Sequence, residues 1–154
     1  MSEVPRLDER IKGRKGYGLI QLIHGHGKGK TTAALGQAVR CAGAGKNVLI
    51  VYFDKGGVTH YSERAIIDQI DAIDYVATGR DRIDPVTNRF DFSITEEDKT
   101  EAARGIEVAK TAMMSGMYDL VILDEVHSTQ NLGMLAVEAV LDALSSKAEM
   151  TEVI

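Results

Sequence analysis

The chain has 154 residues, of which 44% are apolar and 27% are charged, as expected for one compact globular domain with a single core. Its longest apolar runs, such as residues 120–123, are too short to span a bilayer, which excludes a membrane-spanning protein. The formal net charge of −5 argues against a nucleic-acid-binding protein, and the single Cys41 excludes an internal disulfide and fits a reducing compartment.

The N-terminal segment, residues 1–16, differs in charge from the rest of the chain. It holds five basic and three acidic side chains, a net charge of +2, so that the remaining residues carry −7. The segment lacks the apolar core of a signal peptide, and we therefore expect a cytoplasmic protein. Two interpretations of this basic arm stay open, a solvated tail or a lid that folds over an anionic ligand.

Apolar runs alternate with helical patterns along the rest of the chain. Residues 17–23 predict a buried strand that leads directly into a Gly-rich turn. Thr95 and the three acidic residues after it are typical of a helix start, and Gly116 is typical of its end. Residues 78–93 predict a polar loop. The remaining predicted strands are residues 48–53, 73–77, 119–124 and 151–154, and the remaining predicted helices are residues 30–42, 62–71 and 132–144.

This alternation of strands and helices predicts an α/β domain over residues 17–154. Its sheet should be mostly parallel, with helices on both faces, because parallel strands are joined by crossover helices. Ligands of such sheets bind at the carboxyl ends of the strands. The segments that follow strands should therefore line one rim, namely the Gly-rich turn and residues 54–57, 79–82 and 124–127.

The Gly-rich turn, residues 24–32, reads His-Gly-His-Gly-Lys-Gly-Lys-Thr-Thr between a predicted strand and a predicted helix. That context is the one a phosphate-binding loop requires, and it predicts a P-loop NTPase-like fold that binds a nucleotide. Lys30 supplies a charge to the outer phosphates, and Thr31 offers a hydroxyl to Mg²⁺ or Mn²⁺. Thr32 donates to a phosphate or caps the helix. The predicted nucleotide ligands in the turn are Gly25, His26, Gly27, Lys28, Gly29, Lys30, Thr31 and Thr32.

The turn departs from the usual Gly-x-x-x-x-Gly-Lys-Thr spacing. Counted back from Gly29, the first glycine of that pattern falls on His24, and counted from Gly25 the loop is one residue short.

The four histidines of the chain match no zinc-site spacing.

A second motif, residues 120–125, is an apolar strand that ends in Asp124 and Glu125. These carboxylates fall at the same rim as the phosphate loop, where they can hold Mg²⁺ together with Thr31. Two roles for Glu125 stay open. In an ATP hydrolase it would activate water, whereas in a group transferase it would only bind the metal.

The segments GHGKGKTTAALG, FDKGG, TGRD, TEED and YDLVILDEV resemble, in order and spacing, those of the P-loop ATP:cob(I)alamin (corrinoid) adenosyltransferases. The family's loop reads Gly-Asn-Gly-Lys-Gly-Lys-Thr-Thr and is short in the same way, and the resemblance covers residues 17–154. It implies transfer of the 5′-deoxyadenosyl group of ATP to Co(I) of a corrinoid, with release of triphosphate. It also implies a reversed ATP, with its triphosphate in the loop and its ribose 5′ carbon pointing at cobalt.

The resemblance also assigns residues and partners. Lys55 matches the family's Lys-Gly after the second strand and is expected to bind the nucleotide. Thr31, Asp124 and Glu125 match the metal site. Lys28, Lys30 and Glu125 are the expected catalytic residues. Because Co(I) is itself a strong nucleophile, their task is to position the substrates and stabilise the leaving triphosphate. The family implies a homodimer, an N-terminal lid over the corrinoid and a flavoprotein reductant.

Three stretches depart from the family pattern. His26 replaces the usual Asn or Asp of the loop, and residues 127–129 differ from the family's usual run after the acids. Residues 80–82, Arg-Asp-Arg, occupy a stretch where some members carry aromatic side chains that help displace the lower ligand of cobalt. The family normally continues past position 154 with a further strand, so we expect the domain's C-terminal end to be incomplete.

Two alternative functions stay open at the level of sequence. The first is an ordinary P-loop ATPase or kinase, in which Glu125 acts as base or metal ligand. The second is a non-catalytic binder of ATP or corrinoid. Release of intact triphosphate, rather than ADP, distinguishes the adenosyltransferase from the first alternative.

Overall fold

The computed structural model describes residues 16–154, so the predicted basic arm lies almost entirely outside the described residues. No helix within residues 16–154 combines the length and the hydropathy needed to cross a bilayer. The elements are α1 (Lys30–Gly43), β1 (Val48–Tyr52), α2 (Arg64–Ile67), β2 (Ile73–Ala77), α3 (Glu96–Ser115), β3 (Leu120–Asp124), α4 (Val126–Asn131), α5 (Val137–Ser145) and β4 (Glu152–Val153).

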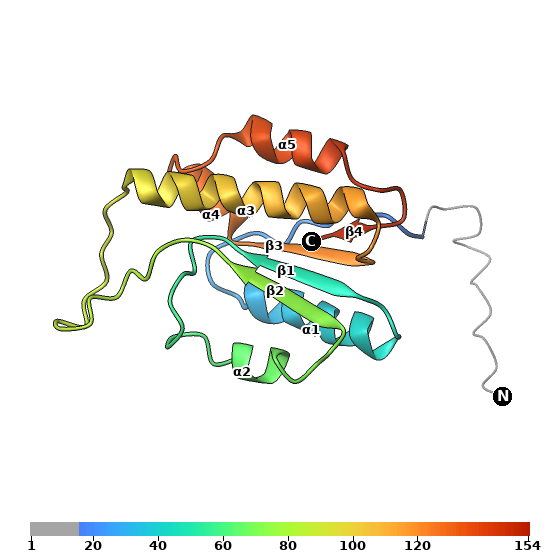
Figure 1. The fold of residues 1–154 in the computed structure, drawn as a ribbon, viewed down its shortest axis with the longest axis horizontal. Coiled ribbons are helices and arrows are strands. Elements are labelled where there is room, and N and C mark those ends of the chain that lie inside the picture. The colour runs from blue at the N-terminus through green and yellow to red at the C-terminus, as the bar shows by residue number, and fades with distance from the viewer. Residues whose placement is uncertain (1–15) are drawn as a thin grey trace.

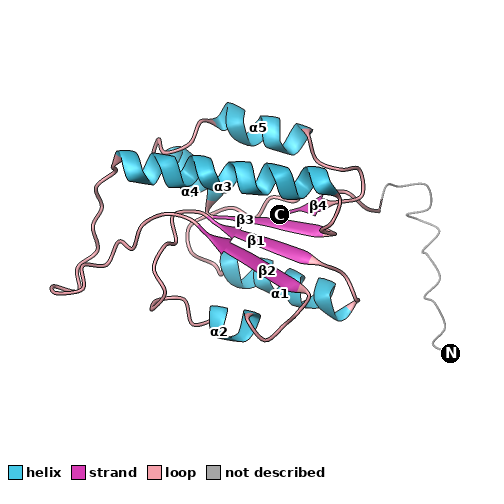
Figure 2. Ribbon diagram, viewed as in Figure 1, coloured by secondary structure: helices cyan, strands magenta, loops and turns pink. Residues whose placement is uncertain are grey.

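The four strands form one sheet in the order β2-β1-β3-β4, and every pair is parallel. Helices α3 and α5 cover one face of the sheet, and α1 and α2 cover the other (Figure 1). Each face has its own apolar core, because alternate side chains of the buried strands β1 and β3 point to opposite faces. The three-layer arrangement in Figure 2 confirms the predicted α/β fold with a parallel sheet.

The prediction of a buried strand at residues 17–23 is wrong. Residues 17–23 make one isolated parallel bridge, between Ile20 and Val153, supported by a hydrogen bond of 2.8 Å from the Gln21 N–H to the Val153 carbonyl. The side chain of Leu22 is 62% exposed. The segment lies beside β4 at the sheet edge, and β4 pairs with β3 over only two residues. A neighbour this short supports one bridge rather than a ladder.

Two predicted helices also differ from the structure. The predicted helix at residues 132–144 begins only at Val137, because Gly133 takes a left-handed φ of 73° that interrupts helical geometry. The preceding polar residues form α4, which the apolar pattern did not reveal. The predicted helix at residues 62–71 is reduced to α2, of which only Arg64 and Ile67 are buried. A helix with so little packing extends over little more than one turn.

Both predicted ends of α3 are confirmed. The Thr95 hydroxyl accepts a hydrogen bond of 3.4 Å from the Asp98 N–H, and the Asp98 carboxylate accepts one of 2.7 Å from the Thr95 N–H. This reciprocal pair is a capping box. At the other end, Gly116 has a φ of 66° and terminates the helix.

We expect Thr95→Ala to lower the free energy of unfolding by about 1 kcal/mol, since the N-cap hydroxyl is lost. Urea denaturation followed by circular dichroism measures the change. Thr111→Ala, at an exposed position inside the same helix, is the matched control and should be neutral or slightly stabilising. Equal effects of the two substitutions would show that the cap contributes nothing.

Candidate nucleotide-binding site

The Gly-rich turn adopts a backbone that few sequences allow. Gly25, Gly27, Lys28 and Gly29 have φ values of 120°, 61°, 65° and 70°, all in the left-handed region that glycine tolerates best. Gly29 is the N-cap of α1, and no side chain of the described residues caps this helix end. The free N–H groups at the start of α1 are therefore available to an anion, and the helix dipole favours negative charge there.

Lys30 lies folded over the turn that precedes it. Its ammonium donates hydrogen bonds of 2.6 Å to the Gly25 carbonyl and 3.3 Å to the Gly27 carbonyl. These contacts hold the turn closed and keep a positive charge at its mouth. Thr32 does not cap α1, so the helix-capping alternative for this residue is wrong and its contact with a phosphate stays a prediction.

The predicted acidic site comes together from three separate segments, the start of α1, the loop after β1 and the end of β3. The Thr31 hydroxyl lies 3.1 Å and 3.2 Å from the two carboxylate oxygens of Asp124. The Lys55 ammonium donates to Asp124 Oδ2 at 2.5 Å and to Thr31 Oγ1 at 3.0 Å, and it lies 3.8 Å from Glu125 Oε1. The predicted rim is thus confirmed, because the loops after β1 and β3 meet the start of α1 at one point.

The oxygen atoms of this acidic site suit a hard divalent cation. Mg²⁺ and Mn²⁺ prefer carboxylate, hydroxyl and water oxygens, and the point between Thr31, Asp124 and Glu125 is already occupied by a cation, the Lys55 ammonium. Within residues 16–154 no group of three or more His, Cys, Asp or Glu side chains is arranged to hold a metal. A cation here would therefore take several of its ligands from water or substrate.

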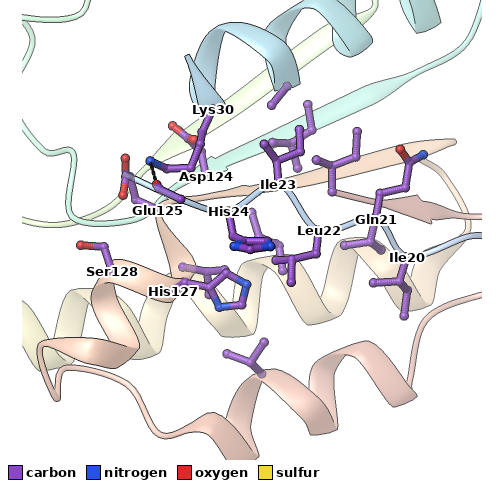
Figure 3. A pocket seen from close by; sticks show the side chains of 18 of the residues that line it. Ile20, Gln21, Leu22, Ile23, His24, Lys30, Asp124, Glu125, His127 and Ser128 are labelled. Atoms are coloured by element: carbon purple, nitrogen blue, oxygen red, sulfur yellow. Dashed lines mark hydrogen bonds between the residues drawn. The ribbon is translucent and has the colours of Figure 1, made fainter. Parts of the chain in front are cut away.

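A cavity of about 620 Å³ lies between the phosphate loop, the end of β3 and helices α4 and α5. Figure 3 shows Lys30, Asp124 and Glu125 at one end of this cavity, and the apolar side chain of Ile20 at the other. The polar end adjoins the phosphate loop, while the apolar end runs toward α5. The cavity thus offers charge at one end and an apolar wall at the other.

Two histidines point into the same cavity (Figure 3). His24 is the first residue of the Gly-rich turn, and His127 comes from the first turn of α4, where its Nδ1 lies 3.0 Å from Gln130 Oε1. The sequence placed His127 on the predicted rim, as the last of residues 124–127, but assigned it no role in the site.

Residues 80–82 serve a structural role that the sequence interpretation missed. Arg82 is 6% exposed and pairs with Asp54 at 2.7 Å and with Asp98 at 3.1 Å. Arg80 pairs with Asp98 at 3.0 Å and with Asp91 at 2.7 Å, and its guanidinium is the first of several donors that hold the pKa of Asp91 well below its usual range. Both arginines thus form ion pairs with neighbouring carboxylates. Through Asp98 they tie the loop between β2 and α3, which projects from the domain in Figure 1, to α3.

Comparison with known proteins agrees with this geometry. A family model described as ATP:corrinoid adenosyltransferase BtuR/CobO/CobP matches residues 16–154. The chain belongs to this family. The resemblance carried by the motifs is therefore confirmed, and with it membership of a transferase family with a P-loop α/β fold.

Three relatives illustrate the match. The corrinoid adenosyltransferase CobA of Salmonella typhimurium strain LT2 is 30% identical over 143 residues, covering 92% of this chain and 69% of that protein. The corrinoid adenosyltransferase of Escherichia coli K12 is 29% identical over 150 residues, covering 97% and 72%. An uncharacterized protein of Nostoc sp. strain PCC 7120 is 40% identical over 146 residues, covering 88% of this chain but only 37% of that protein.

Proposed function

We propose that this protein transfers the 5′-deoxyadenosyl group of ATP to Co(I) of a corrinoid and releases triphosphate. The observation that carries the proposal is the short phosphate loop, which combines left-handed glycines with Lys30 over its mouth in a chain of the adenosyltransferase family. The triphosphate would occupy residues 25–32, with the N–H groups at the start of α1 and the charges of Lys28 and Lys30 directed at its oxygens.

The proposed reaction is a displacement at carbon. The electron pair of Co(I) forms the bond to C5′, the C5′–O bond breaks, and its electron pair leaves on the triphosphate while cobalt is oxidised to Co(III). No proton is transferred, so the site needs no general base. The protein's contribution is to hold the two substrates in line and to stabilise the negative charge of the leaving group.

Thr31, Asp124 and Glu125 would hold Mg²⁺ or Mn²⁺. When bound, this cation neutralises charge on the triphosphate. Glu125 then acts as a metal ligand rather than as a base that activates water, in keeping with its position 3.8 Å from the Lys55 ammonium, where a cation already faces it.

The remaining features rest on the family resemblance and, for the lid and the location, on the composition of residues 1–16. We propose a homodimer, a lid formed by residues 1–16 over the corrinoid, a flavoprotein that reduces the cobalt, and a location in the cytoplasm. Because Arg80 and Arg82 are engaged by Asp54, Asp91 and Asp98, we assign no corrin contact to their side chains.

The products of a single incubation test the proposal. With ATP, Mg²⁺ and a chemically reduced corrinoid, we expect adenosylcorrinoid and intact triphosphate in equal amounts, measured by visible spectroscopy and phosphorus NMR. ADP and phosphate with an unchanged corrinoid spectrum would instead assign an ordinary ATPase or kinase. Tight ATP binding without any product would assign a non-catalytic binder.

A further inference from the structure

Lys55 occupies the centre of the acidic site. Its ammonium touches Asp124 and Thr31 and lies near Glu125, so it uses the same three side chains that would bind a divalent cation. The Lys55 side chain is 15% exposed and that of Asp124 is 7% exposed, so solvent screens their attraction only weakly. The contact is therefore a specific, largely buried ion pair.

The backbone that carries Lys55 is held from both sides. Its N–H donates to the Thr78 carbonyl at 2.9 Å, and its carbonyl accepts a hydrogen bond of 2.7 Å from Arg64. The same guanidinium donates to the Gly57 carbonyl at 2.8 Å. Arg64 is itself 7% exposed, with its guanidinium 4.1 Å from the ring centre of Tyr61. This arginine is a buried clamp on the Lys55 loop.

Close backbone contacts restrict the same loop further. A Cβ on Gly56 would lie 1.9 Å from the Gly79 carbonyl oxygen, and a Cβ on Gly79 would lie 2.8 Å from the Asp54 Cα. The two loops are thus in direct backbone contact, and Arg82 holds the Asp54 carboxylate. Movement of the ammonium out of the acidic site therefore has to come from rotation of the Lys55 side chain, whose four-carbon stem is flexible.

We propose that Lys55 is a resident counter-cation of the acidic site, which a divalent cation displaces when it binds. The inference rests on the proposed use of Mg²⁺ or Mn²⁺ by this site. An ammonium and a metal ion that share the oxygens of Asp124 and Thr31 would lie within a few ångströms of each other, where like charges repel strongly. The lysine holds Asp124 in place while the site has no metal, and after displacement its charge faces the rim where the triphosphate binds.

The first test is metal affinity without ATP or corrinoid. Electron paramagnetic resonance of free Mn²⁺ should show that Lys55→Met binds Mn²⁺ more tightly than the unaltered protein, by roughly tenfold or more, since a competing charge is removed. Lys46→Met is the matched control, because Lys46 pairs with Asp119 at 3.1 Å at the opposite end of β3. The control should bind Mn²⁺ as the unaltered protein does. Equal or weaker binding by Lys55→Met overturns the proposal.

The second test uses the unaltered protein and does not depend on a variant that folds. Acetylation of Lys55, followed by mass spectrometry, should be slow without metal and should accelerate with Mg²⁺ in a saturable way, while acetylation of Lys46 stays constant. If Lys55 remains protected from acetylation at saturating Mg²⁺, its ion pair with Asp124 is fixed. That result overturns the proposed displacement, even if Lys55→Met binds Mn²⁺ more tightly. Neither test contains ATP or a corrinoid. Their outcome is therefore independent of whether the protein transfers the adenosyl group, which the product analysis above tests.

Discussion

Lys30→Ala is expected to weaken ATP binding by about 10- to 150-fold. Loss of one charge-assisted contact to a phosphate costs about 1.5–3 kcal/mol, which corresponds to that range. The substitution also removes the two hydrogen bonds by which the ammonium holds the Gly25 and Gly27 carbonyls. Without them the left-handed turn loses its closure, so the remaining N–H donors are less well ordered for the ligand.

Calorimetric titration with ATP, and separately with inorganic triphosphate, measures this loss. The two ligands should lose affinity by similar factors, because Lys30 is placed at the phosphate loop and not at the nucleoside. Arg40→Ala is the matched control, since Arg40 lies in the last turn of the same helix, away from the loop. It should bind ATP as the unaltered protein does. Unchanged affinity of Lys30→Ala would contradict the phosphate-loop assignment.

The phosphate loop and the acidic strand could be predicted because their signals are local. Gly29, Lys30 and Thr31 lie between a strand-like segment and a helix, and the glycines next to them permit the left-handed turn that the structure shows. Asp124 ends an apolar run, and the ends of parallel strands meet at one rim whatever the details of packing. Proximity of Asp124 to Thr31 follows from these two facts.

The roles of Lys55 and of the two arginines could not be derived in the same way. Family resemblance assigned Lys55 to the nucleotide, but its contact with Asp124 depends on how two loops pack through glycine contacts. Arg82 lies far along the chain from Asp54 and Asp98, and no periodicity connects them. The prediction that residues 17–23 form a buried strand failed for a related reason. Apolar character does not reveal the length of the strand that lies beside a segment.

Among the carboxylates that pair with Arg80 and Arg82, Asp98 is the one whose removal should lower the free energy of unfolding most. Its side chain has no exposed surface and pairs with Arg82 at 3.1 Å and Arg80 at 3.0 Å, while it also accepts the Thr95 N–H at 2.7 Å. Asp98→Ala leaves two guanidinium groups without this partner, and breaking a buried ion pair in this way costs about 3–5 kcal/mol. We expect that loss in the free energy of unfolding by urea denaturation at neutral pH. Asp91→Ala, which removes a half-exposed partner of Arg80, should cost much less.

The pH dependence of Asp98→Asn separates the charge of Asp98 from its shape. Burial raises the pKa of Asp98, but hydrogen bonds from Thr95 and the guanidinium groups of Arg80 and Arg82 together outweigh it and hold the pKa below its ordinary value. The unfolded chain therefore binds the proton more readily. The stabilisation is present above the unfolded pKa of about 3.9 and is lost as the pH falls through the folded value. The asparagine variant lacks this proton equilibrium, so its deficit in unfolding free energy should shrink between pH 7 and pH 3. A deficit that stays constant over this interval would show that the carboxylate charge does not stabilise the loop.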